Sequence, residues 1–338
     1  MLKNKTYLTN LNVFASFAVV ALHTNGKFWE FSSQDYWWRA NIIESVFYFA
    51  VPIFFMISGA TLIDYPERYS TKVFFKRRFQ KVGLVYIVWS FLAYLFTKKT
   101  VNITHLDFAE FFEGVVNSQI NPYYWFFPAI MMIYLSIPLF ASIERSKKRT
   151  VFGHLIITGF IFNSLFPLLF NVLGLKYHSD WTLGVISNYL IFIIIGYWIS
   201  HYKISKKYRL LIYYAGIIGL ALHLILTYRL SFQEQTIVHQ FKGYTNVPSI
   251  LYATSIFTFF AYSSEKIQLF ILKFTKPIRN LTLAIYLIHW FIIQEIIQRS
   301  LFDTTDLYFQ LFGAVPIFIL SFLIIAVLKK VPYVKHLC

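Results

Sequence analysis

The sequence predicts an all-α, polytopic membrane protein with about ten transmembrane helices. Hydrophobic residues make up 57% of the 338 residues, aromatic residues 21% and charged residues only 14%. A soluble chain of this length needs more charge to cover its surface, and apolar runs of about 20 residues match the thickness of the bilayer core. We expect a single membrane domain, residues 1–338, because no loop is long enough to hold a folded soluble domain.

Hydrophobic runs divide the chain into ten expected spans. The first should be retained as a helix, because no small-residue cleavage pattern follows it. In the second, Pro52 removes a backbone hydrogen bond and is expected to bend the helix. The stretch from Ser263 to Lys276 mixes apolar and charged residues and suits an interfacial segment better than another span. The ten spans are 7–25, 41–63, 80–97, 123–143, 151–171, 183–201, 209–228, 248–262, 279–298 and 309–328.

The distribution of basic residues predicts the orientation. With the N-terminus inside, 23 of the 31 Lys and Arg residues fall in cytoplasmic segments, among them Lys3, Lys5 and Lys335. Both termini are therefore expected in the cytoplasm. The net charge of +16 is explained by this topology and by attraction to anionic lipid, which makes nucleic acid a poor candidate partner. Cys338, the only cysteine, receives no function.

His23 is the strongest indication of function. It lies near the far end of the first apolar run, where lipid cannot replace the hydration that an imidazole loses. Ionisable side chains at such depth usually face a cavity or a partner and mark a functional site. A packed, hydrogen-bonded structural histidine is the alternative.

Three motifs in the first third of the chain resemble the type 3 membrane acyltransferases. They are the run from Asn12 to His23-Thr24, the run Val51-Pro-Ile-Phe-Phe-Met-Ile-Ser58-Gly59, and the run Phe74-Phe-Lys76-Arg77-Arg78-Phe. Weaker similarities extend over the rest of the chain, at Tyr124-Trp125-Phe-Phe-Pro128 and Ala284-Ile-Tyr-Leu-Ile-His289-Trp290.

This resemblance implies a ten-helix bundle that moves an acyl group, commonly acetyl from acetyl-CoA, onto a cell-surface glycan or a related acceptor. It also implies that His23 is the catalytic histidine. Family members usually carry Arg or Lys eleven residues before this histidine, where the present chain has Asn12. Eleven residues make about three helical turns, or roughly 16 Å. Either a neighbouring helix supplies the missing charge or the activity differs.

Acyl transfer from a thioester to a hydroxyl needs a base, and a histidine suits that role. We expect His23 to be the general base, with transient acylation of His23 as the alternative. Glu44 is predicted at a similar depth in the second span. It either orients the imidazole and stabilises its charged form, or solvates the end of its helix at the interface.

Basic residues at the start of the third span are candidates for binding the phosphates of acyl-CoA, since arginine binds phosphate bidentately. The alternative is the ordinary excess of positive charge on the cytoplasmic side. Ser58 is expected to line the acyl tunnel, and Gly59 to permit close helix approach. The candidate residues are Lys76, Arg77 and Arg78, with Arg68, Lys72 and Lys81 beside them.

Aromatic residues in the outer loops, among them Trp38 and Trp125, are candidates for binding the acceptor, because sugar rings stack on aromatic faces. An interfacial aromatic belt explains the same residues. His289, near the middle of the ninth span, either lines the acceptor cavity or is a buried structural histidine. No metal site is expected.

These observations predict a multi-pass O-acyltransferase of the plasma membrane. It uses cytoplasmic acetyl-CoA to modify a hydroxyl of a surface polysaccharide or of its lipid-linked precursor, in contact with membrane lipid. The alternative is a transporter or flippase that exports a glycan or an acyl compound, since helices around a polar intramembrane site also serve transport.

Overall fold

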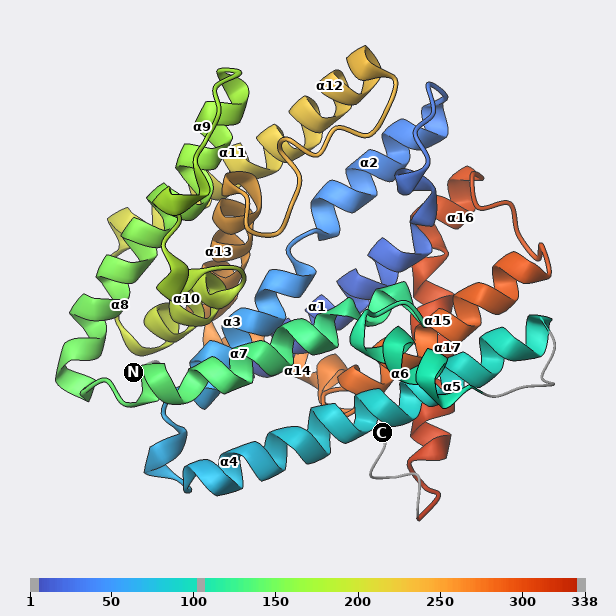
Figure 1. Ribbon diagram of the computed structural model, residues 1–338, viewed down its shortest axis with the longest axis horizontal. Helices are drawn as coiled ribbons and strands as arrows, with labels where there is room; N and C mark the ends of the chain where they lie inside the picture. Colours follow the sequence, from blue (N-terminus) through green and yellow to red (C-terminus); the bar gives the residue numbers. More distant parts are fainter. Residues whose placement is uncertain (1–5, 102–106, 333–338) are drawn as a thin grey trace.

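The computed structural model describes residues 6–101 and 107–332, and these residues form helices without strands (Figure 1). Lys3, Lys5, Lys335 and Cys338 lie outside the described residues. The α-helices are α1 (Thr6–Thr24), α2 (Asp35–Phe47), α3 (Ala50–Leu62), α4 (Thr71–Arg78), α5 (Leu84–Val101), α6 (Phe108–Val116), α7 (Phe126–Ala141), α8 (Arg145–Phe160), α9 (Phe166–Val172), α10 (Leu190–His201), α11 (Lys206–Ala221), α12 (Thr227–Glu234), α13 (Val247–Tyr262), α14 (Glu265–Thr275), α15 (Thr282–Gln298), α16 (Leu307–Phe312) and α17 (Ala314–Leu328).

Short 3₁₀ and π segments connect or interrupt these helices. The five 3₁₀ segments are η1 (Gly26–Trp29), η2 (Tyr65–Glu67), η4 (Pro122–Trp125), η6 (Ser179–Trp181) and η7 (Gly184–Ile186). Three π segments join α4 to α5, α8 to α9 and α11 to α12; they are η3 (Phe79–Gly83), η5 (Ile161–Leu165) and η8 (Leu222–Leu226).

The ten expected spans all contain a helix. Within the described residues, five continuous helical segments are long and apolar enough to cross a membrane. Four shorter apolar helices and α1 accompany them. The chain is therefore a multi-pass helical membrane protein. The five long segments are Asp35–Glu67, Thr71–Lys98, Pro122–Ala141, Arg145–Val172 and Lys206–Glu234, and the shorter ones are α10, α13, α15 and α17.

Two of the spans differ in detail from the expectation. The second is interrupted at Tyr48 and Phe49, one turn before Pro52, which cannot donate a hydrogen bond to the carbonyl of Tyr48. The sixth begins later than predicted, because residues 183–189 contain η7 and Asn188 in the left-handed conformation (φ 53°). Helix α10 is consequently only 12 residues long.

Helix α1 occupies the interior of the bundle, between α3, α14, α15 and α17. Its polar residues face other helices rather than lipid. The buried Asn10 donates to Gln268 of α14 and accepts a hydrogen bond from Thr275. Helix α14 carries apolar side chains on its exposed side and these polar partners on the other, as expected of an interfacial helix.

The backbones of α3 and α10 touch at two glycines. A Cβ atom on Gly59 would lie 1.9 Å from the carbonyl oxygen of Ile193, and one on Gly196 would lie 2.0 Å from that of Met56. No side chain fits at either position. The packing role predicted for Gly59 is confirmed.

A buried ion pair joins the end of α3 to α8. Lys148 Nζ lies 2.7 Å from Asp64 Oδ1, and the two side chains are 5% and 16% exposed. The hydroxyl of Tyr197 lies 3.2 and 3.1 Å from the two carboxylate oxygens. His201 Nε2 lies 3.4 Å from the same carboxylate. This pair is therefore surrounded by hydrogen-bonding partners.

Candidate active site

His23 lies in the last turn of α1, beside two aromatic rings from other elements. Its imidazole stacks on Tyr123 of η4, with ring centroids 3.9 Å apart and planes inclined by 11°. The ring of His289, from α15, is nearly parallel to it. Nδ1 of His23 lies 2.6 Å from Nε2 of His289, which is hydrogen-bond distance. The two histidines form a direct pair.

The surroundings of His289 fix the direction of this hydrogen bond for neutral rings. Nδ1 of His289 lies 3.3 Å from the carbonyl oxygen of Ile285. Because a carbonyl oxygen only accepts, Nδ1 of His289 carries the proton and its Nε2 accepts from Nδ1–H of His23. The free lone pair of His23 is then on Nε2, and this is the nitrogen available to act as a base.

Further hydrogen bonds hold α1 and α15 in register. Asn12 Nδ2 donates to Thr282 Oγ1 at 2.9 Å, at the start of α15. Tyr286 donates to the carbonyl of Tyr123, and Tyr124 donates to the carbonyl of Leu287 at 2.7 Å, so η4 is also tied to α15. The side chain of Asn12 thus links the two histidine-bearing helices.

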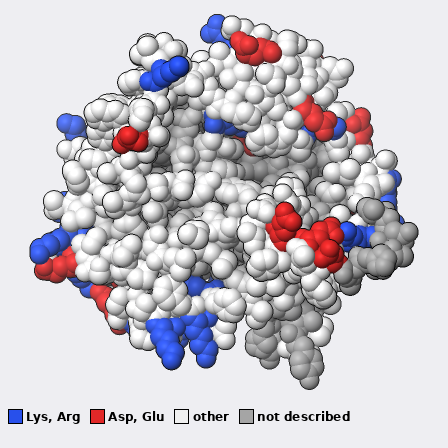
Figure 2. Space-filling model, viewed as in Figure 1, with Lys and Arg blue, Asp and Glu red and all other residues white. Residues whose placement is uncertain are grey.

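A cavity of about 280 Å³ opens beside His23. The space-filling view is hollowed in this region, below α2 and α12 (Figure 2). Glu44 lines the same cavity from α2, so the structure brings the two predicted catalytic residues to one site. The cavity is lined by Val19, Leu22, His23, Trp29, Glu44, Tyr48, Val51, Tyr123, Trp125, Tyr244 and Tyr286.

Glu44 is 2% exposed and lies in a polar environment. The side chains of Asn25 and Lys242 both act on the charge of its carboxylate. Its second oxygen, Oε2, makes no hydrogen bond within the described residues. The partner that orients the His23 ring is His289, whereas Glu44 forms another part of the cavity wall.

Sequence reasoning missed three contributors to this site. They are Tyr123, Tyr286 and Lys242, none of which the sequence singled out as a site residue. Only the spacing of Tyr286 and His289, three residues apart and so on one helical face, gave a signal that they act together. Trp125 does line the cavity, and its ring stacks on Tyr244 with centroids 5.5 Å apart.

The predicted basic residues lie on α4 and η3, at the bottom of Figure 2. Lys76 and Arg77 are exposed, and the guanidinium of Arg77 lies over the ring of Tyr69 at 4.5 Å. Arg78 faces the interior instead. Its guanidinium lies 5.7 Å from the ring centroid of Tyr134 on α7, and its Nε has no hydrogen-bond partner in the described residues.

Ser58 lies close to Arg78 rather than to His23. Its hydroxyl donates to the carbonyl of Phe54 at 3.0 Å, and its side chain also interacts with Tyr134. Ser58 and Val51 are seven residues apart on one face of α3, which is about 10 Å along the helix. Val51 lines the His23 cavity, so Ser58 lies on the same face of α3 about two helical turns away from it.

The model of the acyltransferase domain family matches residues 5–328, which is nearly the whole chain. The chain is a membrane acyltransferase. This confirms the resemblance seen in the sequence and decides for an enzyme over a transporter. No curated protein and no solved structure matches the chain significantly.

Trp38, a predicted candidate for binding the acceptor, lies apart from His23 in the acyltransferase. Trp38 is placed against Tyr228 of α12, with ring centroids 4.5 Å apart, and is not among the residues that line the cavity.

In the described ranges, no three His, Cys, Asp or Glu side chains are grouped so that they could hold a metal ion.

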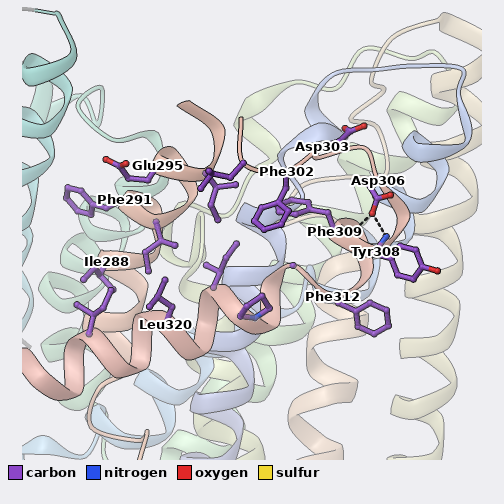
Figure 3. Close-up of a pocket in the computed structure, with 17 residues that line it drawn as sticks. Ile288, Phe291, Glu295, Phe302, Asp303, Asp306, Tyr308, Phe309, Phe312 and Leu320 are labelled. Atoms are coloured by element: carbon purple, nitrogen blue, oxygen red, sulfur yellow. Dashed lines mark hydrogen bonds between the residues drawn. The ribbon is translucent and has the colours of Figure 1, made fainter. Parts of the chain in front are cut away.

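The acyltransferase also has a larger apolar groove, of about 1060 Å³, between α15, α16 and α17 (Figure 3). Side chains such as Ile288, Phe291 and Leu320 point into it from facing helices. Carboxylates lie at its rim: Asp306 accepts hydrogen bonds from the backbone of Tyr308 and Phe309, as the dashed lines show. Ile288 precedes His289 on α15, so one helix borders both the groove and the active site.

Proposed function

We propose that this acyltransferase moves an acetyl group from cytoplasmic acetyl-CoA to a hydroxyl of a cell-surface polysaccharide or of its lipid-linked precursor. The observation that carries the proposal is the His23–His289 pair at the wall of an aromatic-lined cavity, with Nε2 of His23 left free. The protein acts as one domain in the plasma membrane, with both termini in the cytoplasm, as the distribution of basic residues favours.

In the proposed reaction, Nε2 of His23 takes the proton of the acceptor hydroxyl as its oxygen attacks the thioester carbonyl. The C–S bond then breaks, and the thiolate of CoA receives the proton. His289 keeps the His23 ring in the tautomer that this requires. Glu44 provides negative charge near the imidazolium that forms transiently.

The donor is proposed to reach His23 from the α4 side. Arg78 lies at the inner edge of the basic residues with an unused Nε, and arginine suits phosphate. From there the thioester arm follows the face of α3 that carries Ser58 and Val51. This proposal answers how a donor held at one side of the membrane reaches a histidine nearer the other.

The acceptor is proposed to be lipid-linked. The groove between α15 and α17 offers an apolar lining for a hydrocarbon chain, and its carboxylate rim suits the hydroxyls of a sugar headgroup. Trp125 and Trp29, in the wall of the His23 cavity, supply faces on which a sugar ring can stack.

Transfer of radiolabelled acetyl from acetyl-CoA by the purified protein in liposomes tests this function, with an added glycan lipid as the acceptor. We expect His23→Ala to abolish transfer and His154→Ala, at an exposed position of α8, to retain it. Label that accumulates on the protein indicates acylation of His23. Full transfer by folded His23→Ala contradicts the proposal.

A further inference from the structure

Polar atoms without hydrogen-bond partners gather behind the His23 cavity. Among the described residues, twelve buried side-chain atoms lack a partner, and eight of these belong to one region formed by the end of α1, α2, η8, α12 and the segment before α13. Buried polar groups are normally paired, so a concentration of exceptions marks a functional region. The eight atoms belong to Asn25, Asn41, Glu44, Ser45, His223, Thr227 and Lys242.

Lys242 is the cation of this region. It lies in the connection between α12 and α13 and is 5% exposed. Its Nζ lies 4.0 Å from the ring centroid of Phe28 and 5.2 Å from that of Tyr48. These cation–π contacts and the attraction of Glu44 are its stabilising interactions. A buried ammonium group without hydrogen bonds is costly, so a nearby negative charge is needed to keep it charged.

Glu44 in turn requires a nearby positive charge to stay ionised. A carboxylate that is fully buried with one free oxygen takes up a proton unless a cation lies nearby. Lys242 is that cation, and the two side chains interact electrostatically. His223, on η8, faces the same group with its ring 4.5 Å from Tyr48. The π turn that carries His223 is a feature often found at functional sites.

Glu44 also belongs to the wall that contains His23. Both line the same cavity, and the charge of Glu44 acts on Tyr123, the ring that stacks on His23. A negative charge at this place stabilises a positive imidazole. In a low-dielectric interior such an interaction is much stronger than in water.

We propose that Lys242 is a positioning residue that keeps Glu44 ionised in the cavity wall, so that Glu44 stabilises the His23 imidazolium during acyl transfer. The inference rests on the proposed function. Lys242 touches neither the donor nor the acceptor, and it acts on the reaction through Glu44.

The test compares Lys242→Met, Glu44→Gln and the double variant, using acetyl transfer in liposomes and thermal unfolding in detergent. We expect Lys242→Met to lower kcat at least about tenfold, less than the roughly 10²- to 10³-fold typical of removing a direct transition-state donor. KM for acetyl-CoA should stay unchanged, and Lys242→Arg should restore kcat. Lys176→Met, at an exposed position outside the site, is the matched control and should behave as wild type.

The double variant separates a positioning role from a structural one. Removing both charges restores a neutral interior, so we expect it to regain the Tm lost in Lys242→Met but not the lost kcat. If it regains both, or if Lys242→Met transfers acetyl at the wild-type rate, the inference is wrong. Activity that survives in His23→Ala overturns the proposed function itself, which distinguishes the two failures.

Discussion

Two buried acid–lysine pairs in this protein differ in how completely they are hydrogen-bonded. Asp64 and Lys148 are in direct contact at 2.7 Å, with Tyr197 and His201 around the carboxylate. Glu44 and Lys242 interact electrostatically, but Oε2 of Glu44 and Nζ of Lys242 lack hydrogen-bond partners in the described part of the chain.

We interpret the Asp64–Lys148 pair as structural and the Glu44–Lys242 pair as functional, because their hydrogen-bonding surroundings differ. The first pair fastens α3 to α8, and neither of its side chains has a buried polar atom without a hydrogen-bond partner among the described residues. The second borders a cavity and keeps capacity that a substrate or a transition state can use. A buried ion pair is weak evidence of stability, because the cost of desolvation can equal the Coulombic gain. Its surroundings indicate what the pair does.

The largest expected effect is on protein stability, from a change in the Asp64–Lys148 pair. Lys148→Met removes the lysine counter-charge of Asp64 and leaves Tyr197 and His201 as its partners. Breaking a buried pair by removing one member costs about 3–5 kcal/mol, and we expect a value towards the lower end. We expect a large fall in Tm but little change in kcat per folded molecule. Thermal unfolding in detergent, with active-site titration of the folded fraction, measures both. A loss of kcat without a loss of Tm would remove the distinction between the two pairs.

The next effect concerns the orientation of the base. His289→Ala removes the acceptor for Nδ1–H of His23, so the free lone pair is no longer fixed on Nε2. General-base catalysis contributes about 10²- to 10⁴-fold, and we expect a loss of roughly the lower of these values. Acetyl transfer at saturating acetyl-CoA measures it. His154→Ala serves as the control, and a rate like that of wild type would show that His289 is structural.

At the other end of the bundle, Arg78 also has a buried nitrogen, Nε, without a hydrogen-bond partner among the described residues. Comparing Arg78 with the exposed Arg77 tests whether such a group again indicates a binding role. Arg78→Gln is expected to raise KM for acetyl-CoA by about tenfold, equivalent to 1.4 kcal/mol. Arg77→Gln, at an exposed position, should change it less than threefold. Acetyl-CoA titrations of both variants give the result. Equal and negligible changes would leave both arginines with a role in topology alone.

The smallest effect is on the pH dependence of transfer. Burial lowers the pKa of Lys242 to about 8, against an ordinary value of 10.5. Above pH 8 the group progressively loses its charge, so Glu44 loses its counter-charge and we expect transfer to decline a few-fold over about the first pH unit, towards the rate of Lys242→Met. Folding stability should rise over pH 8–10.5, because the unfolded chain then binds the extra proton. Glu44, His223 and Tyr48 are the polar groups that face Lys242.

Rate–pH profiles of wild type and Lys242→Arg measure this effect. Arginine stays protonated throughout this range, so the decline should flatten in the variant. An identical decline in both proteins would assign it to another group.

The sequence predicted the membrane spans, because these depend on local hydrophobicity, and it singled out His23, which lines the cavity, because this is an unusual side chain in an apolar run. It did not predict that His289 bonds His23, since that contact joins positions 266 residues apart. Lys242 was assigned to a loop by counting charges, although the loop folds inward and buries it. The late start of α10 depends on turns that hydropathy does not register.

The contact of α3 with α10 at Gly59 and Gly196 leaves no space between these two helices. No hydrocarbon chain passes between helices whose backbones touch, so a longer acyl group has to lie along the face of α3 that carries Val51 and Ser58. That face is covered by Phe126, whose ring centroid lies 5.8 Å from that of Phe54. If the donor follows the proposed path along this face, we expect smaller side chains at Phe54 and Phe126 to admit longer acyl groups.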